Sequence, residues 1–172
     1  MKKLIFLISV MFLCQPVLYA EDYPLETVVQ TGHFDTVYAR ISPNGRYMAT
    51  IDAAIVDDKT KALKLWEIAT GKELRSFASY IGSVTSVDFS PDNRYIVIGD
   101  SDSTKLFEIT MEKEIRTFDG HSPVHFSSDG QYVFASSQRG IVKLFSISGI
   151  EIRTFKGHSE TISSMDVIDL LK

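Results

Sequence analysis

Short apolar stretches separated by polar turns recur along this chain of 172 residues. The segments between them are rich in Ser, Pro, Asn, Asp and Gly, the residues that tight turns favour. One type of stretch ends in a Ser that begins such a turn, and it lies at 37–42, 84–90 and 123–127. Strand-length apolar stretches bounded by turn residues predict β-strands, so we expect an all-β fold.

The stretches recur in a fixed order, which indicates an internal repeat. The segments EIRTFDGHS (114–122) and EIRTFKGHS (151–159) are nearly identical and lie 37 positions apart. Each unit has four stretches: one that ends in the turn Ser, one that opens with Tyr, one centred on an aromatic residue, and one of the KEIRTF type. The aromatic centres are Trp66, Phe107 and Phe145. We therefore expect three units of four short antiparallel strands each.

This order of motifs resembles the WD-repeat β-propeller family over nearly all of the chain after residue 20. The resemblance rests on the Gly-His pairs at 32/33, 120/121 and 157/158, on the Ser-Pro-Asp/Asn turns, and on Trp66-Glu67, where the family usually has Trp-Asp. It implies an incomplete β-propeller of four-stranded antiparallel blades. The expected propeller fragment is 21–172, with repeats at about 31–78, 79–119 and 120–156 and a partial repeat at 157–172.

In this family a hydrogen-bonded tetrad typically holds the strands of each blade together. The resemblance assigns it, in the first repeat, to His33, Thr50, Asp58 (or the adjacent Asp57) and Trp66. The second and third repeats have Phe107 and Phe145 at the Trp position, and the second has Ile98 at the hydroxyl position. We expect apolar burial to replace most of the tetrad in those two repeats.

The third repeat is shorter than the others. Gly120 to Phe126 spans six positions, whereas Ser79 to Phe89 spans ten. We expect about four residues of its innermost strand and of the preceding loop to be missing, which would make this blade the least regular.

The two ends of the repeat region do not match as neighbours. Residues 157–167 follow the pattern of an innermost strand, and residues 25–30 follow that of an outermost one. Such strands are not adjacent in a blade, and complete propellers take about four to eight blades. Two interpretations stay open: a truncated product of a longer propeller, or an arc completed by another chain, including a homo-oligomer formed through open blade edges.

The first twenty residues have the pattern of a secretory signal peptide. Lys2 and Lys3 precede an apolar run at 4–13, and Ala20 is a suitable cleavage point. Ten apolar residues are too few to span a bilayer, which takes about 20. We expect 1–20 to be removed and the mature chain to be periplasmic or secreted from a bacterium, with no membrane segment.

Charge and cysteine usage argue against nucleic-acid binding and against disulfides. Without the two leader lysines, 16 basic side chains face 22 acidic ones, a net charge of −6. No basic cluster is present for nucleic acid to bind. The single cysteine, Cys14, lies in the leader, so the mature chain can form no disulfide.

The chain has no motif for catalysis or for a cofactor. A G-x-S-x-G nucleophile segment and a Gly-rich phosphate loop are both missing from the sequence. DSDST, from Asp100, is similar to the start of a calcium loop, but Lys105 and Met111 replace the Gly and Glu that such a loop needs. We interpret the histidines at 33, 121, 125 and 158 mostly as repeat markers. We expect no metal, no cofactor and no enzyme activity.

A surface for protein binding remains. The loops from outer to inner strands and from second to third strands would gather on one face, where members of the family commonly bind proteins. That face would carry Phe34, Tyr80 and Arg139, residue types enriched at binding hot spots. The long hairpin at 52–61 is a second candidate surface. We expect a non-catalytic protein-interaction scaffold; the alternatives are a ligand-binding or enzymatic propeller and a truncated product without a function of its own.

Overall fold

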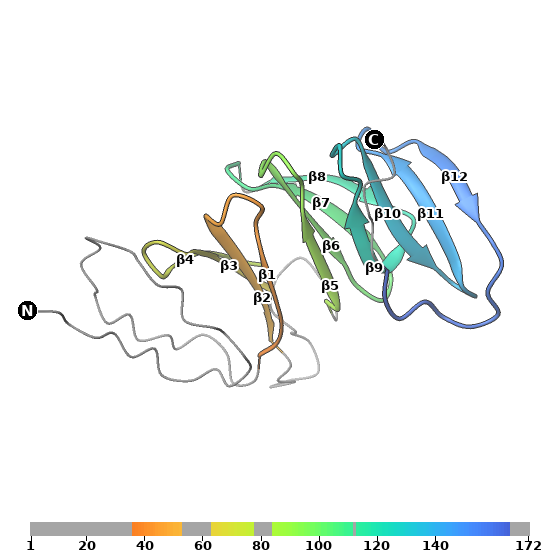
Figure 1. The fold of residues 1–172 in the computed structure, drawn as a ribbon, viewed down its shortest axis with the longest axis horizontal. Coiled ribbons are helices and arrows are strands. Elements are labelled where there is room, and N and C mark those ends of the chain that lie inside the picture. The colour runs from red at the N-terminus through yellow and green to blue at the C-terminus, as the bar shows by residue number, and fades with distance from the viewer. Residues whose placement is uncertain (1–35, 53–62, 78–83, 112, 166–172) are drawn as a thin grey trace, which may run out of the picture.

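The computed structural model describes residues 36–52, 63–77, 84–111 and 113–165, which contain twelve strands in three four-stranded sheets. Figure 1 shows these sheets, here called blades, side by side in chain order. The first blade consists of β1 (Thr36–Ile41), β2 (Tyr47–Asp52), β3 (Leu63–Glu67) and β4 (Lys72–Ser76). The second consists of β5 (Ser86–Phe89), β6 (Tyr95–Gly99), β7 (Thr104–Glu108) and β8 (Lys113–Phe118). The third consists of β9 (His121–Phe126), β10 (Tyr132–Ser137), β11 (Ile141–Ser146) and β12 (Glu151–Phe155).

Neighbouring strands within each blade pair antiparallel in chain order. The predicted all-β class and the four-stranded antiparallel blades are therefore confirmed. In the described ranges the structure contains no helix with the length and apolar character needed to cross a membrane.

The turn after each innermost strand is held by its own leading serine. In the second blade, the Ser90 hydroxyl donates to the carboxylate of Asp92 at 2.6 Å and accepts the backbone N–H of Tyr95 at 2.9 Å. Asn93 adopts a left-handed backbone with φ of 61°, which Asn tolerates better than most residues. Gly45 and Gly130 take this conformation in the equivalent turns, which explains why the three turns share one sequence pattern.

The apolar core lies between the blades. One buried cluster joins Leu63, Leu65 and other residues of the first blade to residues of the second such as Val87. Another joins Leu106 of the second blade to residues of the third such as Val124. Side chains alternate between the two faces of each strand, so the middle blade supplies one set of apolar residues to each neighbour.

The aromatic residues at the expected Trp position pack against the preceding blade. Phe107 meets Phe77 edge to face with ring centroids 5.1 Å apart, and Phe145 lies 5.3 Å from Phe118. All four rings are buried. Apolar packing holds this position in the second and third blades, in the way that the sequence predicted.

The third blade is complete, and the prediction of a shortened innermost strand was wrong. β9 has six residues whereas β5 has four. The missing length comes from the loop, because β8 ends at Phe118 and β9 begins at His121. A connection of two residues is enough because the first strand of the third blade lies beside the second blade.

The described part of the expected fourth repeat also differs from the prediction. Residues 156–165, where the structure describes them, form no strand. The chain there passes the turn between β10 and β11, where a Cβ atom added at Gly140 would lie 2.6 Å from the Cβ atom of His158. It then runs beside the innermost strands, so that Ile162 and Met165 are half-buried.

Candidate partner-binding site

Two members of the expected tetrad are joined in the first blade. The indole Nε1–H of Trp66 on β3 donates to Oγ1 of Thr50 on β2 at 2.8 Å. Both side chains are buried, so this bond ties adjacent strands where water does not compete. His33, Asp58 and the adjacent Asp57 lie outside the described residues, and the complete tetrad stays a prediction.

Of the residues expected to bind a partner, the structure describes one. Arg139 is exposed in the turn between β10 and β11, with φ of 59°. It lies beside Gly140, against which the segment 158–160 packs. Phe34, Tyr80 and residues 53–61 of the long hairpin lie outside the described residues, so the surface predicted from them is untested.

A different group of side chains meets along the innermost strands. Arg40 on β1, Asp88 on β5 and His125 on β9 each stand two residues before the serine that begins the turn. They therefore occupy one position of the repeat in three successive blades. The sequence neighbours of Asp88 and His125 point into the apolar core, so the alternation of the strand turns these two side chains out of it.

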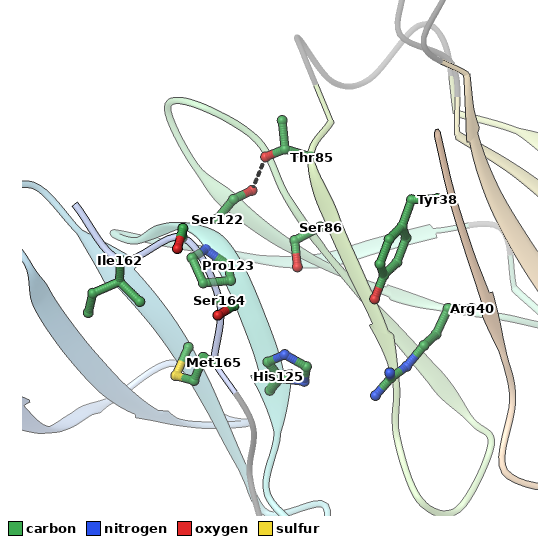
Figure 2. Close-up of a pocket in the computed structure, with 11 residues that line it drawn as sticks. Tyr38, Arg40, Thr85, Ser86, Ser122, Pro123, His125, Ile162, Ser164 and Met165 are labelled. Carbon is green, nitrogen blue, oxygen red and sulfur yellow. Dashed lines mark hydrogen bonds between the residues drawn. The ribbon is translucent and has the colours of Figure 1, made fainter. Parts of the chain in front are cut away.

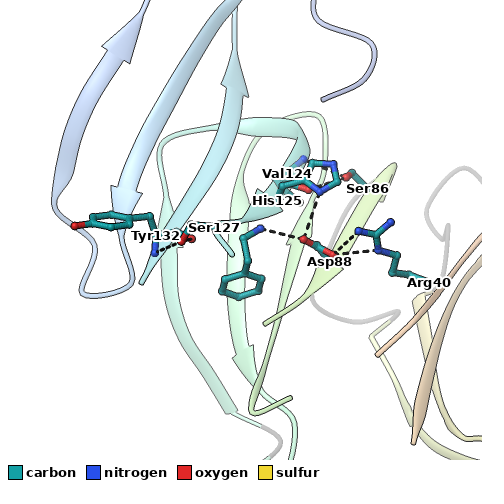
Figure 3. A network of polar contacts seen from close by, with 8 residues as sticks. Arg40, Ser86, Asp88, Val124, His125, Ser127 and Tyr132 are labelled. Atoms are coloured by element: carbon teal, nitrogen blue, oxygen red, sulfur yellow. Dashed lines mark hydrogen bonds and ion pairs between the residues drawn. The ribbon is translucent and has the colours of Figure 1, made fainter. Parts of the chain in front are cut away.

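Asp88 joins all three blades, as Figure 3 shows. Its Oδ1 atom accepts Nε of Arg40 at 3.1 Å and lies 3.0 Å from the second guanidinium nitrogen. Its Oδ2 atom accepts the backbone N–H of Phe126 at 3.0 Å and lies 3.4 Å from Nδ1 of His125. The nearly buried carboxylate of Asp88 therefore has partners at both of its oxygen atoms, one set from the first blade and one from the third.

These contacts determine the ionisation of Asp88. Burial by itself would raise its pKa, because the charged form loses hydration. The hydrogen bond with His125, the backbone N–H of Phe126 and the charge of Arg40 together outweigh burial and hold the pKa of Asp88 below its ordinary value. The carboxylate is therefore ionised at neutral pH.

A second set of contacts lies beside this cluster. The hydroxyl of Ser86 on β5 accepts the backbone N–H of Val124 on β9 at 3.1 Å. Thr85, just before β5, donates its hydroxyl to that of Ser122 on β9. The second and third blades are therefore joined by polar contacts at several levels along their innermost strands.

A pocket of about 380 Å³ opens over these strands. Figure 2 shows Tyr38 and Arg40 on one side of it and His125 with Met165 on the other, with Ser86 between them. The side chain of Arg40 is 42% exposed, whereas that of Asp88 is 10% exposed. The cationic partner of the pair thus faces the pocket, and the anionic partner lies behind it.

The sequence contained a signal for this cluster that our prediction missed. The sequence pattern groups His125 with the histidines that mostly mark the repeats, and the structure places it beside Asp88. Aligned repeats place Arg, Asp and His at one position, outside the apolar alternation. Opposite and titratable charges at one repeat position are a reason to expect contact between neighbouring blades.

The cluster is suited to recognition. Arginine, tyrosine and histidine side chains together offer hydrogen-bond donors and aromatic surface to an anionic or polar group. Among the described residues, no three His, Cys, Asp or Glu side chains gather closely enough to hold a metal ion.

Two segments of the chain match a known repeat family. Residues 71–104 and 112–146 match the family described as WD domain, G-beta repeat. Each matched segment runs from the outermost strand of one blade into the third strand of the next. The resemblance inferred from the Gly-His, Ser-Pro-Asp and Trp-Glu motifs is therefore confirmed.

Curated relatives contain similar sequence. The chain is 29% identical over 115 residues to transcription initiation factor TFIID subunit 5 of Caenorhabditis elegans. The aligned region covers 64% of this chain and 17% of that protein. It is also 27% identical over 131 residues to small ribosomal subunit protein RACK1z of Oryza sativa subsp. japonica. This second aligned region covers 69% of the chain and 37% of RACK1z. The chain thus spans well under half the length of either relative.

Proposed function

We propose that this chain, a member of the WD-repeat β-propeller family, is an exported, non-catalytic scaffold that binds a protein partner along its innermost strands and also self-associates. Its WD repeats and its similarity to non-enzyme WD-repeat proteins support the scaffold role. Its leader, with Lys2 and Lys3 before a short apolar run, supports export.

The observation that carries the proposal is the exposed guanidinium of Arg40 in the pocket over β1, β5 and β9. Its contacts with Asp88 fix the orientation of the side chain before a partner arrives, which lowers the entropy cost of binding. Tyr38 and His125 line the same pocket and are suited to contacts with a partner side chain.

The chemistry of this pocket favours an acidic side chain of a partner protein. A guanidinium pairs best with a carboxylate, because it can donate two hydrogen bonds to it. Arg40 is nevertheless partly neutralised by Asp88, so the pocket would bind one short acidic or polar side chain rather than a long anionic segment. We expect such an interaction to be weakened by salt.

A peptide array tests this proposal. The full chain is applied to immobilised peptides that carry a central Glu or Asp, and to matched peptides that carry Gln or Asn. Binding to the acidic set is expected, and Arg40→Gln is expected to weaken it about tenfold or more. Arg139→Gln is the matched control, because it removes an exposed arginine at the other predicted surface.

The outcomes separate the two surfaces. Loss of binding with Arg40→Gln and retention with Arg139→Gln support the pocket. The reverse pattern would place the binding site on the loop face that the sequence alone suggested. Equal binding to the acidic and neutral peptides would rule out recognition of an acidic group by this pocket.

A further inference from the structure

Each interface between blades in this protein joins two different faces. We call trailing the face of a blade that meets the next blade in the chain, and leading the face that meets the previous one. Phe118 and Leu106 lie on the trailing face of the second blade and pack on the third blade. Phe89 and Ile109 lie on its leading face and pack on the first blade.

The trailing face of the third blade has the same residue pattern without the same burial. Phe155 is 43% exposed, whereas its repeat equivalents Phe77 and Phe118 are each 2% exposed. Leu144 is half-buried, whereas its equivalents in the first two blades, Leu65 and Leu106, are buried. An apolar surface that is covered at two interfaces is thus open at the third.

The leading face of the first blade is open at corresponding positions. Ile41 is 58% exposed, whereas its equivalents Phe89 and Phe126 are 3% and 4% exposed. Ile68 is 42% exposed, whereas Ile109 is 9% exposed. In Figure 1 the first and third blades lie at opposite ends of the row, so the two open faces are separate surfaces of one chain.

We propose that these two faces bind each other between two copies of the chain, with the trailing face of the third blade on the leading face of the first blade of its partner. This inference rests on the self-association in the proposed function and identifies the surfaces that carry it. It does not depend on the pocket beside Arg40.

The interfaces inside the chain supply the argument for this pairing. They join a trailing face to a leading face twice, so the open trailing face already has the shape and residue types that fit a leading face. Arg75 on β4 lies over the ring of Phe107 in the next blade, with its guanidinium carbon 5.4 Å from the ring centroid.

Contacts between unlike faces can join copies of the chain into a closed ring or into an open row. Two copies that each use both faces form two identical contacts and bring together six described blades, a number within the range of complete propellers. A single open contact would leave one apolar face at each end of the assembly. A closed dimer covers both faces of each copy, and we therefore expect the closed form.

Single substitutions at the two faces test the proposal on the full chain, by light scattering after gel filtration and by sedimentation. The wild-type chain is expected to be a dimer at micromolar concentration. Phe155→Asp and Ile41→Asp are each expected to weaken the dimer at least about tenfold, because a carboxylate would be buried in an apolar contact. Both native side chains are partly exposed, so the folded blades should tolerate either change.

Ile152→Asp is the matched control on the same strand as Phe155. Ile152 is 49% exposed, and its repeat equivalents Leu74 and Ile115 are also exposed, even though the blade that contains Ile115 has neighbours on both sides. This position is therefore outside the interface between blades. Ile152→Asp should form the dimer as the wild-type chain does.

Mixing the variants decides how the faces are paired. Phe155→Asp mixed with Ile41→Asp retains one contact between native faces, so the mixture should form heterodimers although each variant alone is monomeric. If Ile41→Asp alone dimerises normally, the contact joins two like faces and the proposal is wrong. A wild-type chain that is monomeric at micromolar concentration also overturns the proposed dimer. If that monomer binds acidic peptides, the pocket beside Arg40 functions without dimerisation.

Discussion

The carboxylate of Asp88 accepts the backbone N–H of Phe126 at 3.0 Å, so a side chain of the second blade satisfies the edge strand of the third. Among the described strands, β9 is the edge of its sheet and pairs with β10 alone. Ser86 accepts the N–H of Val124 in the same way. Exposed edge strands invite unwanted pairing, so these contacts protect β9 while they join the blades.

The first prediction concerns the contribution of Asp88 to stability. Asp88→Asn keeps an oxygen for the N–H of Phe126 but removes the charge that pairs with Arg40 and His125. We expect the free energy of unfolding at pH 7 to fall by about 1–3 kcal/mol. Urea melts followed by circular dichroism measure it. Asp102→Asn, in an exposed part of the β6–β7 turn, should change it by no more than about 0.5 kcal/mol.

The second prediction is the pH dependence of the same effect. Because folding lowers the pKa of Asp88, its contribution is complete above the unfolded-state pKa of about 3.9 and is lost as the pH falls through the lower folded-state pKa. The difference between wild type and Asp88→Asn should therefore shrink in acid, below about pH 4. A difference that stays constant or grows in acid would mean that the carboxylate does not titrate in this way.

The third prediction concerns the bond between Trp66 and Thr50. Thr50→Val keeps the shape of the side chain and removes the oxygen that accepts the buried indole N–H. We expect a loss of about 1–3 kcal/mol in the free energy of unfolding. The exposed Thr110→Val is the control and should be nearly neutral. A neutral Thr50→Val would show that the hydrogen bond does not help to hold β2 and β3 together.

The fourth prediction concerns the segment after β12. Gly140→Ala would place a methyl group against the backbone oxygen of Glu160 and 2.6 Å from the Cβ atom of His158. We expect this segment to be displaced and trypsin to cut faster after Lys156. Gly45→Ala is the matched control, because Gly45 has a similar φ of 70° but no atom within 4 Å of the added methyl group. Equal cleavage rates in the two variants would mean that backbone strain alone causes the faster cleavage.

The fifth prediction concerns export. Intact-mass analysis of the chain expressed in bacteria and recovered from the periplasm or the medium should give a mature form that begins at Glu21. Fusing residues 1–20 to a reporter protein should export the reporter, and Lys2→Glu with Lys3→Glu should slow this export. A mature form that retains Met1 or carries a lipid on Cys14 would contradict the prediction.

Local chemistry allowed the strands and turns to be read from the sequence. The Ser-Asp turns satisfy their own hydrogen bonds within about five residues, as the contacts of Ser90 with Asp92 and Tyr95 show. Alternation of apolar residues then specifies which side of a strand enters the core. The three four-stranded blades, and the aromatic residues that fill the Trp position, follow from these short-range rules.

Contacts between blades decided the rest, because they join residues far apart in the chain. Arg40 and Asp88 are 48 positions apart, and only an alignment of the repeats, not a local pattern, indicates that they meet. The shortened third repeat lost its loop rather than its strand because β9 lies directly beside the second blade.

The repeated segments EIRTFDGHS and EIRTFKGHS show the same limit. They end their blades with equivalent residues, yet Phe118 is 2% exposed and Phe155 is 43% exposed. The sequence by itself determined that both form an outermost strand with an apolar final residue. The tertiary structure decided which phenylalanine is buried, because burial depends on a neighbouring blade that packs against one of them and leaves the other open.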